Sequence, residues 1–128
     1  MAKLLRVSPY AEDELNLPVR SVDSAISFYQ SVFGFRVVEK FEEPIAKAIL
    51  ERDGIQIGLA ENGGDPTQEG CFFEVDDVDA MFDELKSRGL AQSEPNFRTD
   101  QHGETRYRVF FVIAPDELCY CLGQEERD

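Results

Sequence analysis

The chain has 128 residues, of which 42% are hydrophobic and ten are phenylalanine, which is enough apolar material for one domain with its own core. Its 26 acidic and 13 basic residues give a formal charge of −13, which argues against nucleic acid and anionic membranes as partners, since both require a cationic face. It contains neither an apolar run near the roughly 20 residues of a membrane span nor the apolar core of a signal peptide, so we expect a cytoplasmic protein.

The first predicted elements are a strand and a helix that follow a polar lead. A strand is expected at about 13–19, because Leu17 and Val19 alternate across Pro18. A helix follows, with Ser21 as its N-cap and Gly34 at its C-terminal end. Its apolar stripe recurs at helical spacing and comprises Val22, Ala25, Ile26, Tyr29, Val32 and Phe33.

Three strands complete the first half of the chain. The first is predicted at 35–43, and the other two at 45–51 and 55–60 form a hairpin around Asp53-Gly54, a favoured two-residue turn. The segment 61–69 is rich in glycine and contains an Asp-Pro pair, so we expect it to link two modules, of which module one covers about 13–60.

The second half repeats the same design as module two, at about 70–123. A strand is predicted at 70–75, a helix from Val78 towards Gly89, and strands near 96–100, 105–113 and 118–123. Leu17 and Phe73 occupy equivalent places 56 residues apart, which indicates a duplicated module. Each half reads strand, helix and then three strands, so the sequence predicts one α+β domain made of two βαβββ modules.

These features resemble the vicinal oxygen chelate superfamily, which includes glyoxalases, extradiol dioxygenases and bleomycin-resistance proteins. The resemblance extends from Leu15 to Leu122, and its most recognisable pieces are LPVRSVDSAISFYQSVFGF in the first half and EVDDVDAMFDELKSRG in the second. It implies two modules whose curled mixed sheets surround a cavity, often in a two-fold homodimer. Fold alone does not fix the function.

The resemblance also marks four positions where the family's metal ligands usually stand. In this chain they fall on Glu14, Gly58, Gly70 and Cys121. Glycine has no side chain to donate, and one carboxylate with one thiol is too few for a first-row metal, which needs three or four protein ligands. The only histidine, His102, is expected at a polar hairpin tip. We therefore expect no metal and no cofactor.

Period-two alternation assigns the strand faces and with them a candidate ligand-binding wall. Leu15, Leu17 and Val19 are expected to pack on the helix, and Cys71, Phe73 and Val75 to enter the core. The predicted ligand-binding residues, which face the cavity instead, are Glu14, Asn16, Gln56, Phe72, Glu74 and Cys121. Tyr107, Phe110 and Phe111 are either further wall or core, and Cys121 lacks a histidine base that would make it a nucleophile.

Carboxylates, amides and an aromatic ring suit the capture of a cationic or amphipathic small molecule better than the activation of water. The sequence therefore favours a metal-free protein that binds a small molecule. The resemblance is greatest to the bleomycin-resistance branch, which implies sequestration of a drug without chemistry, and it also implies a homodimer. One alternative is a metal-dependent lyase, isomerase or dioxygenase with a displaced site that uses Glu14, Glu74 and Cys121. Another is an interaction module that binds no ligand, so whether the chain is an enzyme stays open.

Overall fold

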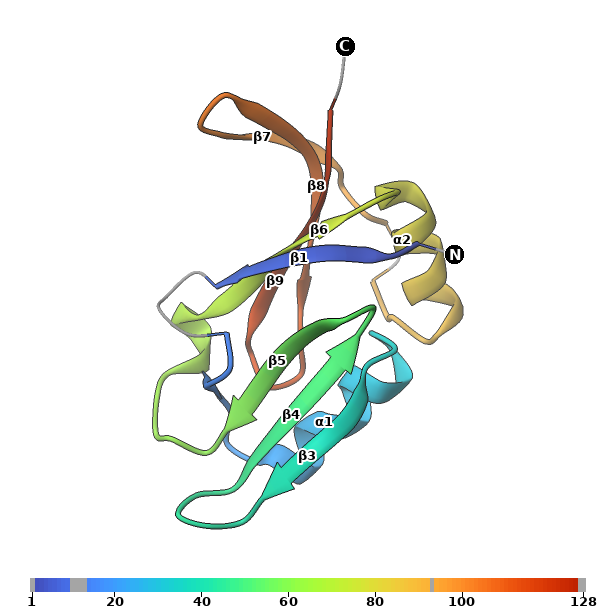
Figure 1. The fold of residues 1–128 in the computed structure, drawn as a ribbon. Coiled ribbons are helices and arrows are strands. Elements are labelled where there is room, and N and C mark those ends of the chain that lie inside the picture. The colour runs from blue at the N-terminus through green and yellow to red at the C-terminus, as the bar shows by residue number, and fades with distance from the viewer. Residues whose placement is uncertain (1, 10–13, 93, 127–128) are drawn as a thin grey trace.

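The computed structural model describes residues 2–9, 14–92 and 94–126, which form two mixed sheets and two helices (Figure 1). The smaller sheet has the order β2-β5-β4-β3 and the larger sheet the order β1-β6-β9-β8-β7. The strands are β1 (Leu4–Pro9), β2 (Leu17–Pro18), β3 (Arg36–Phe41), β4 (Lys47–Arg52), β5 (Ile55–Ala60), β6 (Gly70–Val75), β7 (Arg98–His102), β8 (Thr105–Ile113) and β9 (Cys119–Glu125). These elements confirm the predicted α+β class.

The topology of the smaller sheet is repeated in the larger one. In each half the first strand pairs parallel with the last, β2 with β5 and β6 with β9, and the remaining strands pair antiparallel. The helices α1 (Val22–Ser31) and α2 (Val78–Ser87) have the same length and begin at side-chain caps, Ser21 and Asp77. No helix in the described part of the chain is long and apolar enough to cross a membrane.

The N-terminal segment departs from the prediction, because β1 lies where a polar lead was expected. It pairs antiparallel with β6 and forms an edge of the larger sheet (Figure 1). The strand predicted at 13–19 is much shorter, since β2 contains only Leu17 and Pro18. Residue 13, where the predicted strand began, lies outside the described residues. Leu15 was expected in the core, but its side chain is 37% exposed.

The main core lies between the two halves and is rich in aromatic rings. Phe33 of the first half packs against Phe73 and Tyr120 of the second, with ring centroids 6.4 and 5.3 Å away. The Tyr29 hydroxyl is hydrogen-bonded to that of Tyr120 and donates to Asp116, so no polar group is left unpaired there. The apolar stripe predicted for α1 therefore joins the two modules.

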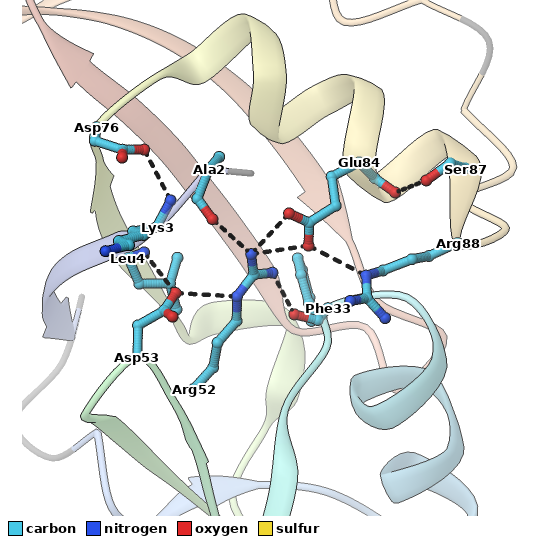
Figure 2. A network of polar contacts seen from close by, with 10 residues as sticks. All are labelled: Ala2, Lys3, Leu4, Phe33, Arg52, Asp53, Asp76, Glu84, Ser87 and Arg88. Atoms are coloured by element: carbon cyan, nitrogen blue, oxygen red, sulfur yellow. Dashed lines mark hydrogen bonds and ion pairs between the residues drawn. The ribbon is translucent and has the colours of Figure 1, made fainter.

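A buried ion pair connects the same two halves near the C-terminal ends of α1 and α2 (Figure 2). Arg52 at the end of β4 lies 2.8 Å from Glu84 of α2, and their side chains are only 9% and 6% exposed. The Arg52 guanidinium also donates to the carbonyl oxygens of Phe33 and Ala2 and pairs with Asp53. One arginine thus connects the N-terminus, the end of α1, the β4–β5 turn and α2.

Candidate functional site

The larger sheet carries a second apolar cluster on the face turned away from the main core. Phe72, Tyr107, Val109 and Cys121 form this cluster, and Phe111 packs against it. Strand register explains the grouping, because Phe72 lies opposite Cys121, and Cys121 lies opposite Phe111. Neighbouring Phe73 instead enters the main core, which confirms the predicted alternation in β6.

A polar group adjoins this apolar cluster on the same face. Arg6 lies opposite Glu74 in the β1–β6 pair, and its Nε donates to the carboxylate at 2.7 Å. Its Nη2 donates to the Tyr107 hydroxyl at 3.0 Å and its Nη1 to Ser8 Oγ at 3.0 Å. The guanidinium carbon is 5.6 Å from the centroid of the Phe72 ring, within cation–π range.

Sequence reasoning missed Arg6 and Ser8, because both lie on the strand that was taken for a polar lead. The available indication was the alternation of Arg6 and Ser8 with Val7, which packs against the main core. A register shift between Leu4 and Arg6 interrupts it. Tyr107 and Phe110 were left open between wall and core, and the structure places Tyr107 in the second cluster and Phe110 in the main core.

A depression of about 450 Å³ adjoins Glu74 where β6 and β9 end. It is lined by Leu5, Glu74, Val75, Asp76, Gln124 and Glu125. Three carboxylates thus surround a hollow next to the aromatic side chains, and Leu5 adds an exposed apolar surface. Such a mixture suits a ligand with a cationic group and an apolar body.

The other three predicted binding residues do not join this group. Asn16 accepts a hydrogen bond from Lys47 on the smaller sheet, and Gln56 is exposed and donates to Glu51 there. Asn16 lines a separate depression of about 340 Å³ with Phe41, Glu43, Pro44, Ile45 and Lys47. Glu14 is half-buried, and its main-chain carbonyl oxygen accepts a hydrogen bond from the amide of Gly58. The structure therefore brings Phe72, Glu74 and Cys121 together and places Glu14, Asn16 and Gln56 elsewhere.

The four positions marked as metal ligands by the resemblance do not fit a metal ion. A Cβ added to Gly58 would lie 2.0 Å from the carbonyl oxygen of Leu15, and one added to Gly70 would lie 1.7 Å from that of Cys119. Main chain therefore fills the space that a ligand side chain would need. Burial raises the pKa of Cys121 to about 12, so its thiol is protonated near neutral pH in the chain as it stands.

A wider search for donors among the described residues gives the same outcome. No group of three or more His, Cys, Asp or Glu side chains in that part of the chain is arranged to hold a metal ion. The main chain of His102 ends β7, and its side chain lies outside the described residues. Cys71 is buried in the main core, and burial raises the pKa of its thiol to about 12.

Known structures with the same fold include proteins that bind antibiotics. A bleomycin-binding protein solved with bleomycin is 24% identical, with 91% of this chain and 99% of that chain covered and a TM-score of 0.63. TnmS3, an antibiotic-binding protein from Streptomyces sp. CB03234, is 22% identical, with 91% of this chain and 97% of that chain covered and a TM-score of 0.65. The virulence protein STM3117 from Salmonella typhimurium is 19% identical, with 89% of this chain and 95% of that chain covered and a TM-score of 0.67. At these identities the likeness shows the fold.

Sequence comparison identifies the family directly. A search of curated proteins found no significant match. A family model described as Glyoxalase/Bleomycin resistance protein/Dioxygenase superfamily matches residues 12–116, which is most of the chain and includes module one and the part of module two that precedes β9. The chain belongs to the glyoxalase/bleomycin resistance protein/dioxygenase superfamily.

Proposed function

We propose that this protein is a metal-free small-molecule-binding protein that captures a cationic or amphipathic ligand, such as a drug, without chemical change. Phe72, Glu74 and Cys121 would contact the ligand on the face of the larger sheet that carries the second cluster. The observation that carries the proposal is the contiguity of a buried aromatic wall, Phe72 and Tyr107, with the Glu74 carboxylate and an acidic depression.

The chemistry of these residues favours binding over catalysis. The aromatic faces of Phe72 and Tyr107 attract cations and apolar rings, and Glu74 supplies the opposite charge. Cys121 is a neutral thiol at physiological pH, so it offers apolar contact and no activated nucleophile. A formal charge of −13 further enriches cations near the surface.

The known relatives of the same fold support this class of function. One is a bleomycin-binding protein complexed with bleomycin and another is an antibiotic-binding protein, and capture is the activity that we transfer to this chain. We also propose a homodimer, in which Gln56 of the smaller sheet, with Glu14 and Asn16 of the segment before it, would complete the ligand site from the partner. In such a dimer all six predicted binding residues would belong to one site, although they lie apart in the single chain.

Isothermal titration with metal-free bleomycin, a cationic glycopeptide, tests the proposal. We expect saturable binding by the wild-type protein and about tenfold weaker binding by Glu74→Gln, which keeps the shape and removes the charge. Glu94→Gln is the matched control, because Glu94 is exposed and lies outside the second cluster and the depression. Equal losses in both variants would refute a specific role for Glu74, and absence of heat with all three proteins would refute capture of this drug class.

A further inference from the structure

The side chain of Arg6 binds the groups that the proposed ligand site would offer to a cation, the Glu74 carboxylate and the Tyr107 hydroxyl. We propose that Arg6 is an internal occupant of a site for planar cations, guanidinium or amidinium, and that a ligand binds by displacing it from Glu74. The inference rests on the proposed function and adds the ligand class and a built-in competitor.

The contacts of the guanidinium define the shape of the cation that fits. Glu74 accepts from Nε, the Tyr107 hydroxyl accepts from Nη2 and the Ser8 hydroxyl accepts from Nη1, so all three nitrogens are engaged. The Phe72 ring lies 5.6 Å from Cζ. Several acceptors distributed around one flat cation distinguish a guanidinium or amidinium from a compact ammonium, which is a point charge.

The charge of Arg6 is favoured by the same neighbours. The hydrogen bond to Glu74, followed by that to Tyr107, raises the pKa of Arg6. These groups therefore stabilise a cation at this position. The same preference applies to a ligand cation of similar geometry, because the carboxylate and the hydroxyl interact with the charge and not with the chain that carries it.

Arg6 is held in a way that permits displacement. Its side chain is 49% exposed and that of Glu74 is 18% exposed, and an ion pair that is open to solvent contributes little to stability. β1 is an edge strand with a register shift between Leu4 and Arg6. The buried Arg52–Glu84 pair contrasts with it, since those side chains are 9% and 6% exposed and fix the two modules.

Space for the body of a ligand adjoins the cation position. The depression of about 450 Å³ shares Glu74 with the Arg6 site and continues to Glu125 and Leu5. Glu125 lies opposite Tyr107 in the β8–β9 pair, so the hollow and the aromatic wall meet at neighbouring positions of the sheet. A ligand whose cation replaces the Arg6 guanidinium can thus extend its remaining atoms into this hollow.

Titration of the full chain with benzamidine, followed by NMR chemical shifts, tests the inference. Benzamidine carries a planar amidinium, and benzamide is its neutral counterpart. We expect Arg6→Ala to bind benzamidine about three- to tenfold more tightly than wild type, because the competitor is gone. Arg36→Ala is the matched control: Arg36 is an exposed arginine on the smaller sheet paired with Glu51, and its loss changes the net charge equally.

The outcomes separate this inference from the proposed function. Tighter benzamidine binding by Arg6→Ala, unchanged binding by Arg36→Ala and no comparable gain for benzamide support the inference. Unchanged, weaker or undetectable benzamidine binding by Arg6→Ala overturns it, and bleomycin titration of the wild-type protein then decides independently whether capture itself stands. If circular dichroism shows that Arg6→Ala is unfolded, Arg6→Met replaces it, since methionine keeps the aliphatic stem without the charge.

Discussion

Substitution of Gly70 with alanine tests whether main chain closes a position that the family resemblance marks as a metal ligand. Gly70 has a φ of +153° and begins β6, where it pairs with Cys119 of β9. An added Cβ would lie 1.7 Å from the carbonyl oxygen of Cys119, although real Cβ contacts are essentially never under 3.0 Å. The two strands would therefore have to separate by more than 1 Å in the middle of the larger sheet.

The expected cost follows from three local effects. Overpacking costs about 1–3 kcal/mol, an unfavourable backbone conformation about 1–3 kcal/mol, and a weakened hydrogen bond about 1 kcal/mol. The bond at risk joins the Cys119 amide to the Glu69 carbonyl at 3.2 Å. We expect a total loss of about 4 kcal/mol, which lowers the melting temperature of a chain this long by roughly 15 °C.

Urea and thermal unfolding, followed by circular dichroism, measure this loss. Gly63→Ala is the control, because Gly63 also has a positive φ of +81° but has no atom within 4 Å of an added Cβ. Backbone strain alone should cost Gly63→Ala about 1 kcal/mol, or roughly 4 °C. If Gly70→Ala melts within about 2 °C of Gly63→Ala, the close approach of β6 and β9 is refuted.

Three further predictions concern buried polar groups. Glu84→Gln should lower the free energy of unfolding by about 2–4 kcal/mol, because the buried charge of Arg52 would keep only the more exposed Asp53 as an ionic partner; a loss under about 1 kcal/mol in urea would contradict this. Burial raises the pKa of Asp116, so its contribution to stability falls as pH rises from about 4 through its folded-state pKa. Asp116→Asn should therefore gain stability relative to wild type between pH 4 and 7, and a constant difference would contradict the assignment. Cys71 and Cys121, with pKa values of about 12, should react with Ellman's reagent at pH 7.5 only after unfolding, and rapid labelling of both in the native protein would contradict their burial.

Repetition made most of the fold predictable from the sequence. α1 and α2 begin 56 residues apart, and α1 begins at the predicted cap, Ser21. β5, β6 and β8 have the predicted bounds, and the turn at Asp53-Gly54 has the positive φ values that its residues favour. β1 escaped prediction because an edge strand with a register shift shows no strict alternation. Its partner β6 is far away in sequence, and only tertiary structure brings the two together.

The sequence predicted which candidate residues share a face of one sheet, but not which residues of the two sheets lie close together. Alternation correctly grouped Phe72 and Glu74 of β6 and put Cys121 of β9 on the same face, because a strand's period fixes its own side-chain directions. It could not say how the two sheets are placed relative to each other, so Asn16 and Gln56 were joined to that group and the structure finds them with partners on the smaller sheet. Whether a homodimer reunites them is part of the proposed function.

The effect of metal removal on ligand binding distinguishes capture by the protein alone from metal-dependent binding. The protein should be purified without chelator, analysed for metals by mass spectrometry and titrated with metal-free bleomycin before and after treatment with EDTA. We expect less than about a tenth of an equivalent of any transition metal per chain, and the same affinity for bleomycin before and after EDTA treatment. About one equivalent of metal per chain, together with loss of binding after chelation, would contradict this expectation.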